Sequence, residues 1–301
     1  MTTEQYTNLI NTPPVFDDGE PITIDGLLDH AKNLVPLPSV VIKLLDVIDK
    51  QDISSDRIAR IIERDQAITA AVLRMANSAF YRPMSTITSL QTAVSWVGIR
   101  GVRDIAMAAS LIKAPAESRE LVDILRKHML ATGSCARVIC AHVTRINKEI
   151  AFLGGLLKDL GRFLITLAIP GSYYQLCELA EASGVSIEDA ERAWFGFTQA
   201  EVGAHLAKQW QFPQLVVDVI RYQNHTLAQR ASLAPEKSWY VSAALLADEI
   251  ALHIRHGNYL DPSHFENHES QAALRLSGQQ YETILEECTA AISEMQSVFD
   301  L

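Results

Sequence analysis

The stretch at residues 150–167, IAFLGGLLKDLGRFLITL, says most about the fold of this chain. Apolar residues fill nearly all of it, and its only charged residues are Lys158, Asp159 and Arg162. It shows no alternation of polar and apolar residues of the kind typical of a half-buried strand. It is also shorter than the ~20 apolar residues that a membrane-spanning helix needs. The pattern therefore predicts one continuous helix that is buried in the core of a globular protein and does not span a membrane.

Helical spacing continues on both sides of this segment. Upstream, apolar residues at Val41, Leu44, Leu45 and Ile48 follow the i, i+3, i+4, i+7 pattern of a helix with one buried face. The 301 residues include only 14 Gly and 11 Pro, and 48% of them are apolar. We therefore expect an all-α protein of one large or two modest domains with a substantial core. Trp96, Trp194 and Trp210 are expected to anchor that core.

Charge and cysteine content exclude several functions and locations. The net charge is −10, which makes the chain a poor general binder of nucleic acid or anionic membrane. The N-terminus MTTEQYTNLI has no signal-peptide pattern, and the cysteines form no CxxC pair. We therefore expect a cytoplasmic protein with buried, reduced thiols at Cys135, Cys140, Cys177 and Cys288.

Several segments together resemble one family. These are LPSVVIKLLDVI (37–48), IIERDQAITAAVLRMANSAFY (61–81), SLQTAVSWVGIRGVRDIAM (89–107), AFLGGLLKDLGR (151–162) and AEVGAHLAKQWQFP (200–213). In this order they resemble the HDOD domain, a bacterial helical module related to HD-type metal phosphohydrolases. The resemblance covers about residues 34–248. It implies a helical N-terminal subdomain packed on an HD-like helical bundle, in a protein of bacterial signalling or regulation.

Pattern and resemblance together suggest four parts. Residues 1–22 form an N-terminal arm, either loosely held or packed on the body as a surface tail. Residues 23–114 form the helical N-terminal subdomain, ending at Ala114-Pro115, and residues 115–260 form the HD-like subdomain. Residues 261–301 form a C-terminal helical tail. Asn77 and Ser78, between two helices of the N-terminal subdomain, are expected to shape a turn.

The resemblance also implies where a metal site would lie. HD enzymes bind divalent metal with His and Asp side chains from several helices and hydrolyse phosphoesters with metal-activated water. The matching positions here are His128, Lys158, Asp159, Gln199, Gln223, Asn224 and Asp248. Among these, only His128, Asp159 and Asp248 keep side chains that could bind a metal. The other positions would be His in a complete two-metal site.

The replacement at Lys158 is chemically decisive. A protonated lysine has three donors and no acceptor, so it cannot bind a metal and brings a positive charge to the site. We therefore predict that the Lys158 ammonium replaces the metal by pairing with Asp159 or Asp248. Arg162 is a second partner open to Asp159. His225 in a shifted register, or His253 with His256, are further positions for a metal, although surface or core roles fit these histidines better.

Two classes of function remain. The favoured one is a non-catalytic signalling or regulatory module that has no cofactor and acts through a protein partner or a small anionic ligand. The alternative is a phosphodiesterase-like enzyme with one Mn, Fe or Mg ion on His128, Asp159 and Asp248, so enzymatic activity stays undecided. Nucleic-acid binding is a third and weaker hypothesis, since no recognised motif is present.

Overall fold

The structure, a computed structural model, describes residues 3–12, 14–16, 19–34, 39–48, 54–78, 81–112, 119–143, 146–254 and 268–299. Regular structure in these ranges is helical, with one isolated antiparallel bridge between Val15 and Pro21 and no strand. The all-α prediction is therefore confirmed. The expected boundaries at 114/115 and 260/261 lie outside the described residues.

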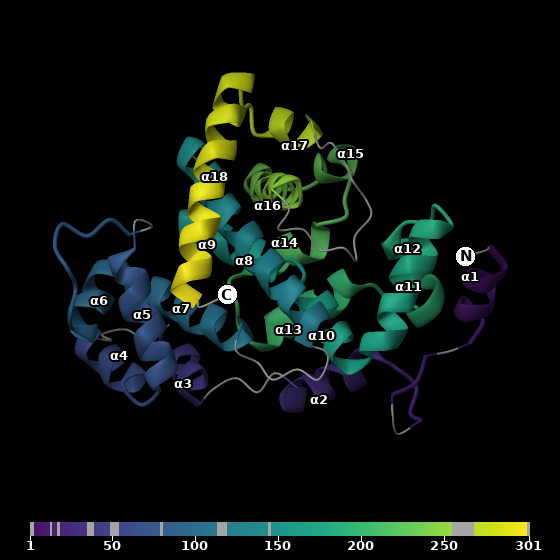
Figure 1. Cartoon of the computed structure of the whole chain (residues 1–301), viewed down its shortest axis with the longest axis horizontal. Coiled ribbons are helices and arrows are strands. Elements are labelled where there is room, and N and C mark those ends of the chain that lie inside the picture. Colours follow the sequence, from purple (N-terminus) through teal and green to yellow (C-terminus); the bar gives the residue numbers. More distant parts are fainter. Residues whose placement is uncertain are drawn as a thin grey trace.

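The helices form a central bundle with further helices on either side of it (Figure 1). Their bounds are α1 (Thr3–Ile10), α2 (Ile24–Leu34), α3 (Ser39–Ile48), α4 (Ser55–Ile62), α5 (Gln66–Asn77), α6 (Leu90–Val97), α7 (Ile99–Ile112), α8 (Arg119–His142), α9 (Lys148–Leu157), α10 (Leu160–Ala168), α11 (Pro170–Ala182), α12 (Ile187–Phe195), α13 (Gln199–Gln209), α14 (Gln214–Tyr222), α15 (Leu227–Arg230), α16 (Pro235–His253), α17 (His268–Ala273) and α18 (Gly278–Phe299).

Helices α3 to α7 form the left-hand group in Figure 1. Local capping explains where two of them begin: the Ser54 side chain accepts from Arg57 N at the start of α4, and Asp65 accepts from Ala67 N and Ile68 N at the start of α5. The apolar faces of these helices then meet in a common core that also includes residues of α8 to α14. The N-terminal group is thus continuous with the bundle through shared apolar packing.

The centre of the molecule is a bundle in which α8 packs on α9, α16 and α18. A glycine permits the closest of these approaches. A Cβ on Gly155 of α9 would lie 2.7 Å from the Thr132 backbone oxygen of α8. Gly161 of α10 has no room for a side chain either, because a Cβ there would overlap the backbone oxygen of Gln199 in α13. These two contacts fix how α8, α9, α10 and α13 meet.

The segment at 150–167 is not one continuous helix, and that prediction was wrong. Helix α9 ends at Leu157, a turn contains Lys158 and Asp159, and α10 begins at Leu160. Asp159 leaves helical geometry with φ −93° and ψ 20°, and its side chain makes no capping hydrogen bond to α10. The interruption redirects the chain and places two adjacent charged residues in the middle of a buried apolar segment.

The two chain ends are held against the body. In the N-terminal segment α1 packs on α11 and α12, and Trp194 Nε1 donates a hydrogen bond of 2.8 Å to Thr12 O. The packed-tail alternative therefore describes these residues. At the other end, α18 lies along α8 and reaches α5, where Arg74 Nε donates to Val298 O at 2.7 Å. Helix α18 thus ties the bundle to the N-terminal group (Figure 1).

Other sequence predictions are settled by burial. Cys135, Cys140, Cys177 and Cys288 are buried free thiols, as predicted. Trp194 is buried and Trp210 packs on the core, but Trp96 has 46% of its surface exposed, so its prediction as a core anchor was wrong. The buried face of α6 is already formed by other residues, and Trp96 lies outside that face. None of the described helices is both long enough and apolar enough to cross a membrane.

Candidate functional site

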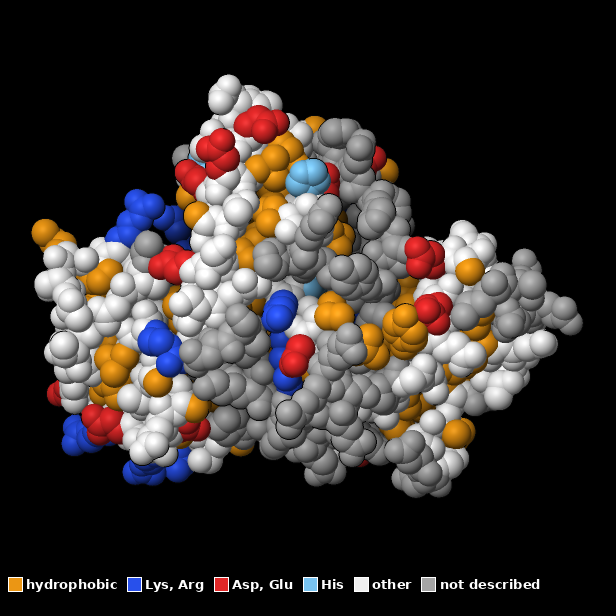
Figure 2. All heavy atoms as spheres, viewed as in Figure 1, with side chains coloured by type: hydrophobic (Ala, Val, Ile, Leu, Met, Phe, Trp, Pro, Cys, Tyr) orange, Lys and Arg blue, Asp and Glu red, His pale blue; other side chains and the backbone are white. Residues whose placement is uncertain are grey.

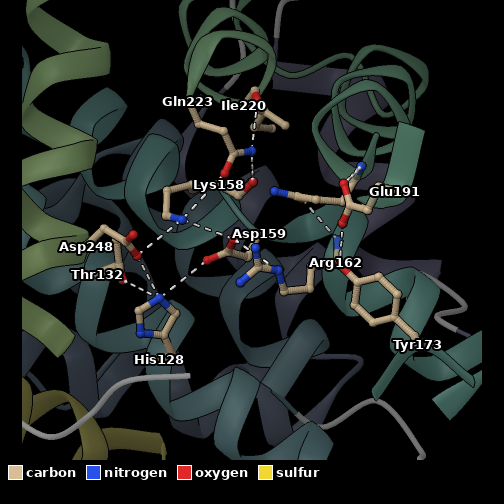
Figure 3. Close-up of polar contacts among 11 residues, drawn as sticks. His128, Thr132, Lys158, Asp159, Arg162, Tyr173, Glu191, Ile220, Gln223 and Asp248 are labelled. Carbon is tan, nitrogen blue, oxygen red and sulfur yellow. Dashed lines mark hydrogen bonds and ion pairs between the residues drawn. The ribbon is translucent and has the colours of Figure 1, made fainter. Parts of the chain in front are cut away.

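The turn between α9 and α10 meets α8, α14 and α16, and Figure 3 shows the side chains that come together there. Lys158 and Asp159 come from this turn, His128 from α8, Gln223 from the end of α14, and Asp248 from α16. All but Asp248 are buried, and the side chain of Asp248 is only 15% exposed. Five residues distant in sequence thus form one polar cluster inside the bundle.

Lys158 joins the two carboxylates of this cluster. Its Nζ lies 3.1 Å from Asp159 Oδ1 and 3.2 Å from Asp248 Oδ1, and only 4% of its side chain is exposed. A third neighbour is Gln223 Oε1, at 3.5 Å. Each of the three donors of the ammonium therefore has an oxygen within reach. Lys158 thus contacts both Asp159 and Asp248, the two acidic residues that were predicted from the sequence as its alternative partners.

His128 approaches the same two carboxylates from α8. Its Nε2 lies 2.7 Å from Asp248 Oδ1 and 3.4 Å from Asp159 Oδ2. Because a carboxylate only accepts, His128 Nε2 is the donor in the contact with Asp248. Asp248 Oδ1 therefore accepts from both the imidazole and the ammonium, and it links α16 to α8 and to the α9–α10 turn.

Protonation states follow from these contacts. Burial would lower the pKa of His128, but the charges and hydrogen bonds of Asp248 and Asp159 outweigh it and raise that pKa to about 9. Burial would raise the pKa of Asp159, but the charges of Lys158 and Arg162 and the contact with His128 hold it well below its usual range. At neutral pH the cluster therefore holds an imidazolium beside ionised carboxylate.

The remaining candidate positions have different places. Gln223 belongs to the cluster and also braces it, since its Nε2 donates to Lys158 O at 2.7 Å. Gln199 is buried behind the cluster, where its Oε1 accepts from Arg162 N at 3.2 Å. Asn224 is exposed. The structure thus brings together five of the candidate residues, keeps Gln199 next to the cluster and leaves Asn224 outside it.

Two features of the site were not predicted from the sequence. Thr132 Oγ1 lies 3.5 Å from His128 Nε2, one helical turn away along α8, so the i+4 spacing was the available signal. Glu191, fully buried, accepts from Tyr173 Oη and from Gln199 N, and so lies behind the cluster. No local pattern around Glu191 points to that role. Arg162, proposed from sequence, has its Nε 4.0 Å from Asp159 Oδ1.

His225 and His253, the alternative histidines that the structure describes, do not join the cluster. The ring of His225 packs against Tyr222, with centroids 4.9 Å apart. His253 is exposed at the end of α16, and His256 lies outside the described residues. Among the described residues, only His128, Asp159 and Asp248 bring potential metal-binding atoms together, all within 4.8 Å of one another.

These three residues, as arranged, do not fit a divalent cation. The oxygens such an ion would need already accept from the Lys158 ammonium and from His128. Lys158, Arg162 and the raised pKa of His128 give the cluster three positive groups against the two carboxylates. A further double charge would be repelled at this distance in a buried site. The donor set is therefore that of an ion-pair cluster.

Comparison with known proteins places this cluster in a family. The model of the HDOD domain matches residues 34–226, which is more than half of the chain. The chain belongs to the HDOD family. The HDOD match spans the helices that supply His128, Lys158, Asp159 and Gln223, whereas Asp248 and α18 lie beyond it. The resemblance noted from sequence is therefore confirmed.

Individual relatives of this HDOD chain are distant. An uncharacterised protein of Treponema pallidum (strain Nichols) is 24% identical over 202 residues, covering 66% of this chain and 39% of that protein. The chain thus spans well under half the length of that curated relative.

Solved structures agree in fold at similarly low identity. An HDOD domain protein of unknown function from Geobacter sulfurreducens has a TM-score of 0.68, 23% identity, and coverage of 92% and 98% of the two chains. A protein of Shewanella amazonensis, provisionally named a phosphohydrolase, also has a TM-score of 0.68, with 23% identity over 91% and 97%. A provisionally named signal transduction protein of Marinobacter aquaeolei has a TM-score of 0.65 and 19% identity over 99% and 64%. These likenesses establish the HDOD fold.

Proposed function

We propose that this chain is a regulatory HDOD module that works without catalysis and without a bound metal, through contact with a protein partner. The observation that carries the proposal is the position of the Lys158 ammonium, 3.1 Å from Asp159 Oδ1 and 3.2 Å from Asp248 Oδ1. An HD-type hydrolase would need these carboxylates for its metal and an open coordination position for water. Here they are engaged by a side chain of the protein itself.

The cluster then has a structural role that replaces that of an ion. His128 and Asp248 belong to separate helices and Asp159 to the turn between α9 and α10, and Lys158 supplies a fixed positive charge between the two carboxylates. A buried ion pair of this kind contributes little net stability compared with an apolar core, but it specifies one arrangement of the groups that must meet. The HD-like bundle is thereby kept in one geometry, as a regulatory scaffold requires.

Partner binding is favoured over sensing of a small anion at Lys158. An anion would have to replace two carboxylates that already neutralise the ammonium, and the Lys158 side chain is only 4% exposed. A regulatory role also agrees with the Marinobacter aquaeolei structure, which is provisionally named a signal transduction protein. The Shewanella amazonensis name, a phosphohydrolase, describes the activity that the proposal denies to this chain.

The proposal is tested by metal content and hydrolysis. Untagged protein expressed with manganese and iron supplied is analysed by plasma mass spectrometry, and bis(p-nitrophenyl) phosphate is offered with Mn²⁺. We expect well under one metal per chain, the same content in Asp159→Ala, and no hydrolysis above buffer. One metal per chain that is lost in Asp159→Ala, together with hydrolysis that is lost in the same variant, would contradict the proposal and indicate a mononuclear phosphodiesterase.

A further inference from the structure

Residues 81–89, between α5 and α6, lie at the edge of the N-terminal group, on the left in Figure 1. Asn77 makes two hydrogen bonds with Ile87: Asn77 Nδ2 donates to Ile87 O at 2.8 Å, and Ile87 N donates to Asn77 Oδ1 at 2.7 Å. Trp96 of α6 adds a third tie, because its Nε1 donates to Tyr81 O at 3.2 Å. Asn77, which was predicted to shape a turn, thus ties the end of α5 to Ile87, and Trp96 ties α6 to Tyr81.

Residues 81–89 and the adjacent helix α6 expose side chains that are typical of protein interfaces. Met84 is 98% exposed and Trp96 of α6 is 46% exposed, and both are among the exposed large apolar residues in the part of the chain that the structure describes. Arg82 is exposed beside them and is held in the left-handed region with φ 47°, an unfavourable conformation for a residue other than glycine. Met, Trp and Arg are enriched at the centres of protein–protein interfaces.

A hollow of about 410 Å³ adjoins residues 81–89 and is lined by Asn77, Ser78, Arg82, Pro83, Met84, Ser85 and Thr86. Hydroxyl and guanidinium groups lie among the lining side chains, and none of the lining residues is acidic. Such a lining suits a carboxylate, since Arg and hydroxyl groups donate hydrogen bonds to it. Met84 lines the hollow, and Trp96 contacts the chain at Tyr81, the residue before Arg82. These two exposed side chains suit an apolar side chain of the same partner.

Residues 66–103, which include this surface, carry a positive charge, whereas the whole chain is acidic. Residues 66–103 contain no Asp or Glu, although the chain carries 36 acidic residues, and this is its longest acid-free stretch. The stretch contains Arg74, Arg82, Arg100 and Arg103, of which Arg82 and Arg100 are exposed. In Figure 2 most of the visible Lys and Arg side chains lie over the side of α3 to α7, where some Asp and Glu are also visible, and further Asp and Glu lie over the upper end of α18 and over the right-hand side of the molecule.

We infer that the surface made by Arg82, Met84, Trp96 and the adjoining hollow is the docking site for an acidic peptide segment of a partner protein, with a carboxylate in the hollow and an apolar side chain against Met84 and Trp96. Charge complementarity selects this occupant. A nucleic acid needs several phosphate contacts from Lys or Arg, and only Arg82 and Arg100 are exposed in this acid-free stretch. The inference builds on the proposed regulatory role and involves none of the residues of the Lys158 cluster.

The test uses the full chain and an array of 12-residue peptides in which acidic, neutral and basic members share the same apolar spacings. Labelled peptides from the array are then measured by fluorescence anisotropy. We expect acidic peptides to bind best, Arg82→Glu to weaken their binding at least about tenfold, and Met84→Ser to weaken it about threefold to tenfold. Salt should weaken the same binding, because exposed charges carry part of it.

Arg64→Glu is the matched control. Arg64 is also exposed, but it precedes α5, whereas Asn77 ends it. The two ends of a helix of this length are roughly 18 Å apart. Arg64→Glu should leave peptide binding unchanged, and far-UV circular dichroism should show that each variant folds.

Four results would overturn the inference. One is no preference for acidic peptides, and another is equal loss of binding in Arg64→Glu and Arg82→Glu. A third is tighter, Arg82-dependent binding of a 12-nucleotide single-stranded DNA, which would make phosphate the ligand. The fourth is a Met84-dependent dimer in sedimentation equilibrium, which would make a second copy the occupant. Because none of these measurements depends on metal content, a failure here is distinguishable from a failure of the metal-free proposal.

Discussion

Lys158 Nζ lies 3.2 Å from Asp248 Oδ1, and this contact joins the turn between α9 and α10 to the distant helix α16. The same carboxylate oxygen accepts from His128 Nε2 at 2.7 Å, so one atom of α16 holds both α8 and the turn. In an HD-type hydrolase a metal would make these connections. A lysine in this place supplies a charge that no chelator removes.

Removing the lysine should destabilise the fold. In Lys158→Met, two carboxylates lose a buried partner, and a loss of about 3–5 kcal/mol in the free energy of unfolding is expected. Urea denaturation followed by circular dichroism measures it. Lys208→Met, at an exposed position of α13, is the matched control and should change stability by less than ~0.5 kcal/mol. A loss below ~1 kcal/mol in Lys158→Met would show that the ammonium does not hold the cluster.

Replacing the lysine by a histidine should create metal binding. Lys158→His removes the positive charge and adds a nitrogen ligand beside His128, Asp159 and Asp248, whose ligand atoms already lie within 4.8 Å of one another. Mn²⁺ should then raise the Tm of Lys158→His, since about 2.7 kcal/mol is gained when free metal is 100 times the Kd. The wild-type chain and Lys158→Met should show no such rise. A rise of equal size in the wild-type chain would contradict the account.

Stability should fall as pH rises through the range set by His128. An ordinary histidine has a pKa of ~6.5 in an unfolded chain, whereas the carboxylates of Asp248 and Asp159 raise the pKa of His128 to about 9 against the effect of burial. Between these values the folded state binds the extra proton, so its advantage is complete below pH ~6.5 and is lost by pH ~9.

The matching measurement is urea denaturation at a series of pH values for the wild-type chain, His128→Gln and the exposed-site control His205→Gln. The difference between the wild-type chain and His128→Gln should shrink as pH rises from about 6.5 to about 9. A constant difference over that range would show that His128 holds no extra proton in the folded state. His205→Gln should follow the wild-type chain throughout.

Close packing between α10 and α13 gives a further prediction. Gly161→Ala would force a Cβ into the backbone oxygen of Gln199, next to the turn that presents Lys158 and Asp159. A loss of about 3 kcal/mol is expected, because neither backbone can yield without disturbing the core. Gly171→Ala in α11, where a Cβ meets nothing within 4 Å, should instead stabilise by about 0.4–1 kcal/mol. Thermal unfolding of both variants tests the pair, and equal effects would contradict it.

The all-α class and most of the helices could be predicted from the sequence, because few Gly or Pro residues interrupt its apolar periodicity. The break at Lys158 and Asp159 could not, since an unbroken apolar run predicts a continuous helix and the interruption depends on how α8 and α13 approach the two glycines. The exposure of Trp96 could have been predicted from the sequence. Leu90, Ala93, Val94 and Val97 already fill the i, i+3, i+4, i+7 face of α6, which leaves Trp96 outside that face.

The site was predictable to a similar extent. The resemblance to a known family selected His128, Asp159 and Asp248, which no periodicity could have brought together from two separate helices and a turn. It also selected Gln223 and Asn224 together, but neighbouring residues at the end of a helix point in different directions, so only Gln223 faces the cluster. Glu191 stayed hidden because its partners, Tyr173 and Gln199, come from other helices.

The central claim, that the Lys158 ammonium replaces the metal of an HD-type site, is tested most directly by diffraction. Crystals grown with excess MnCl₂ are measured at a wavelength where manganese scatters anomalously. The account predicts no anomalous peak among His128, Asp159 and Asp248, with Lys158 Nζ in contact with both carboxylates. A manganese peak bound by these three residues, with the Lys158 side chain turned away, would contradict it.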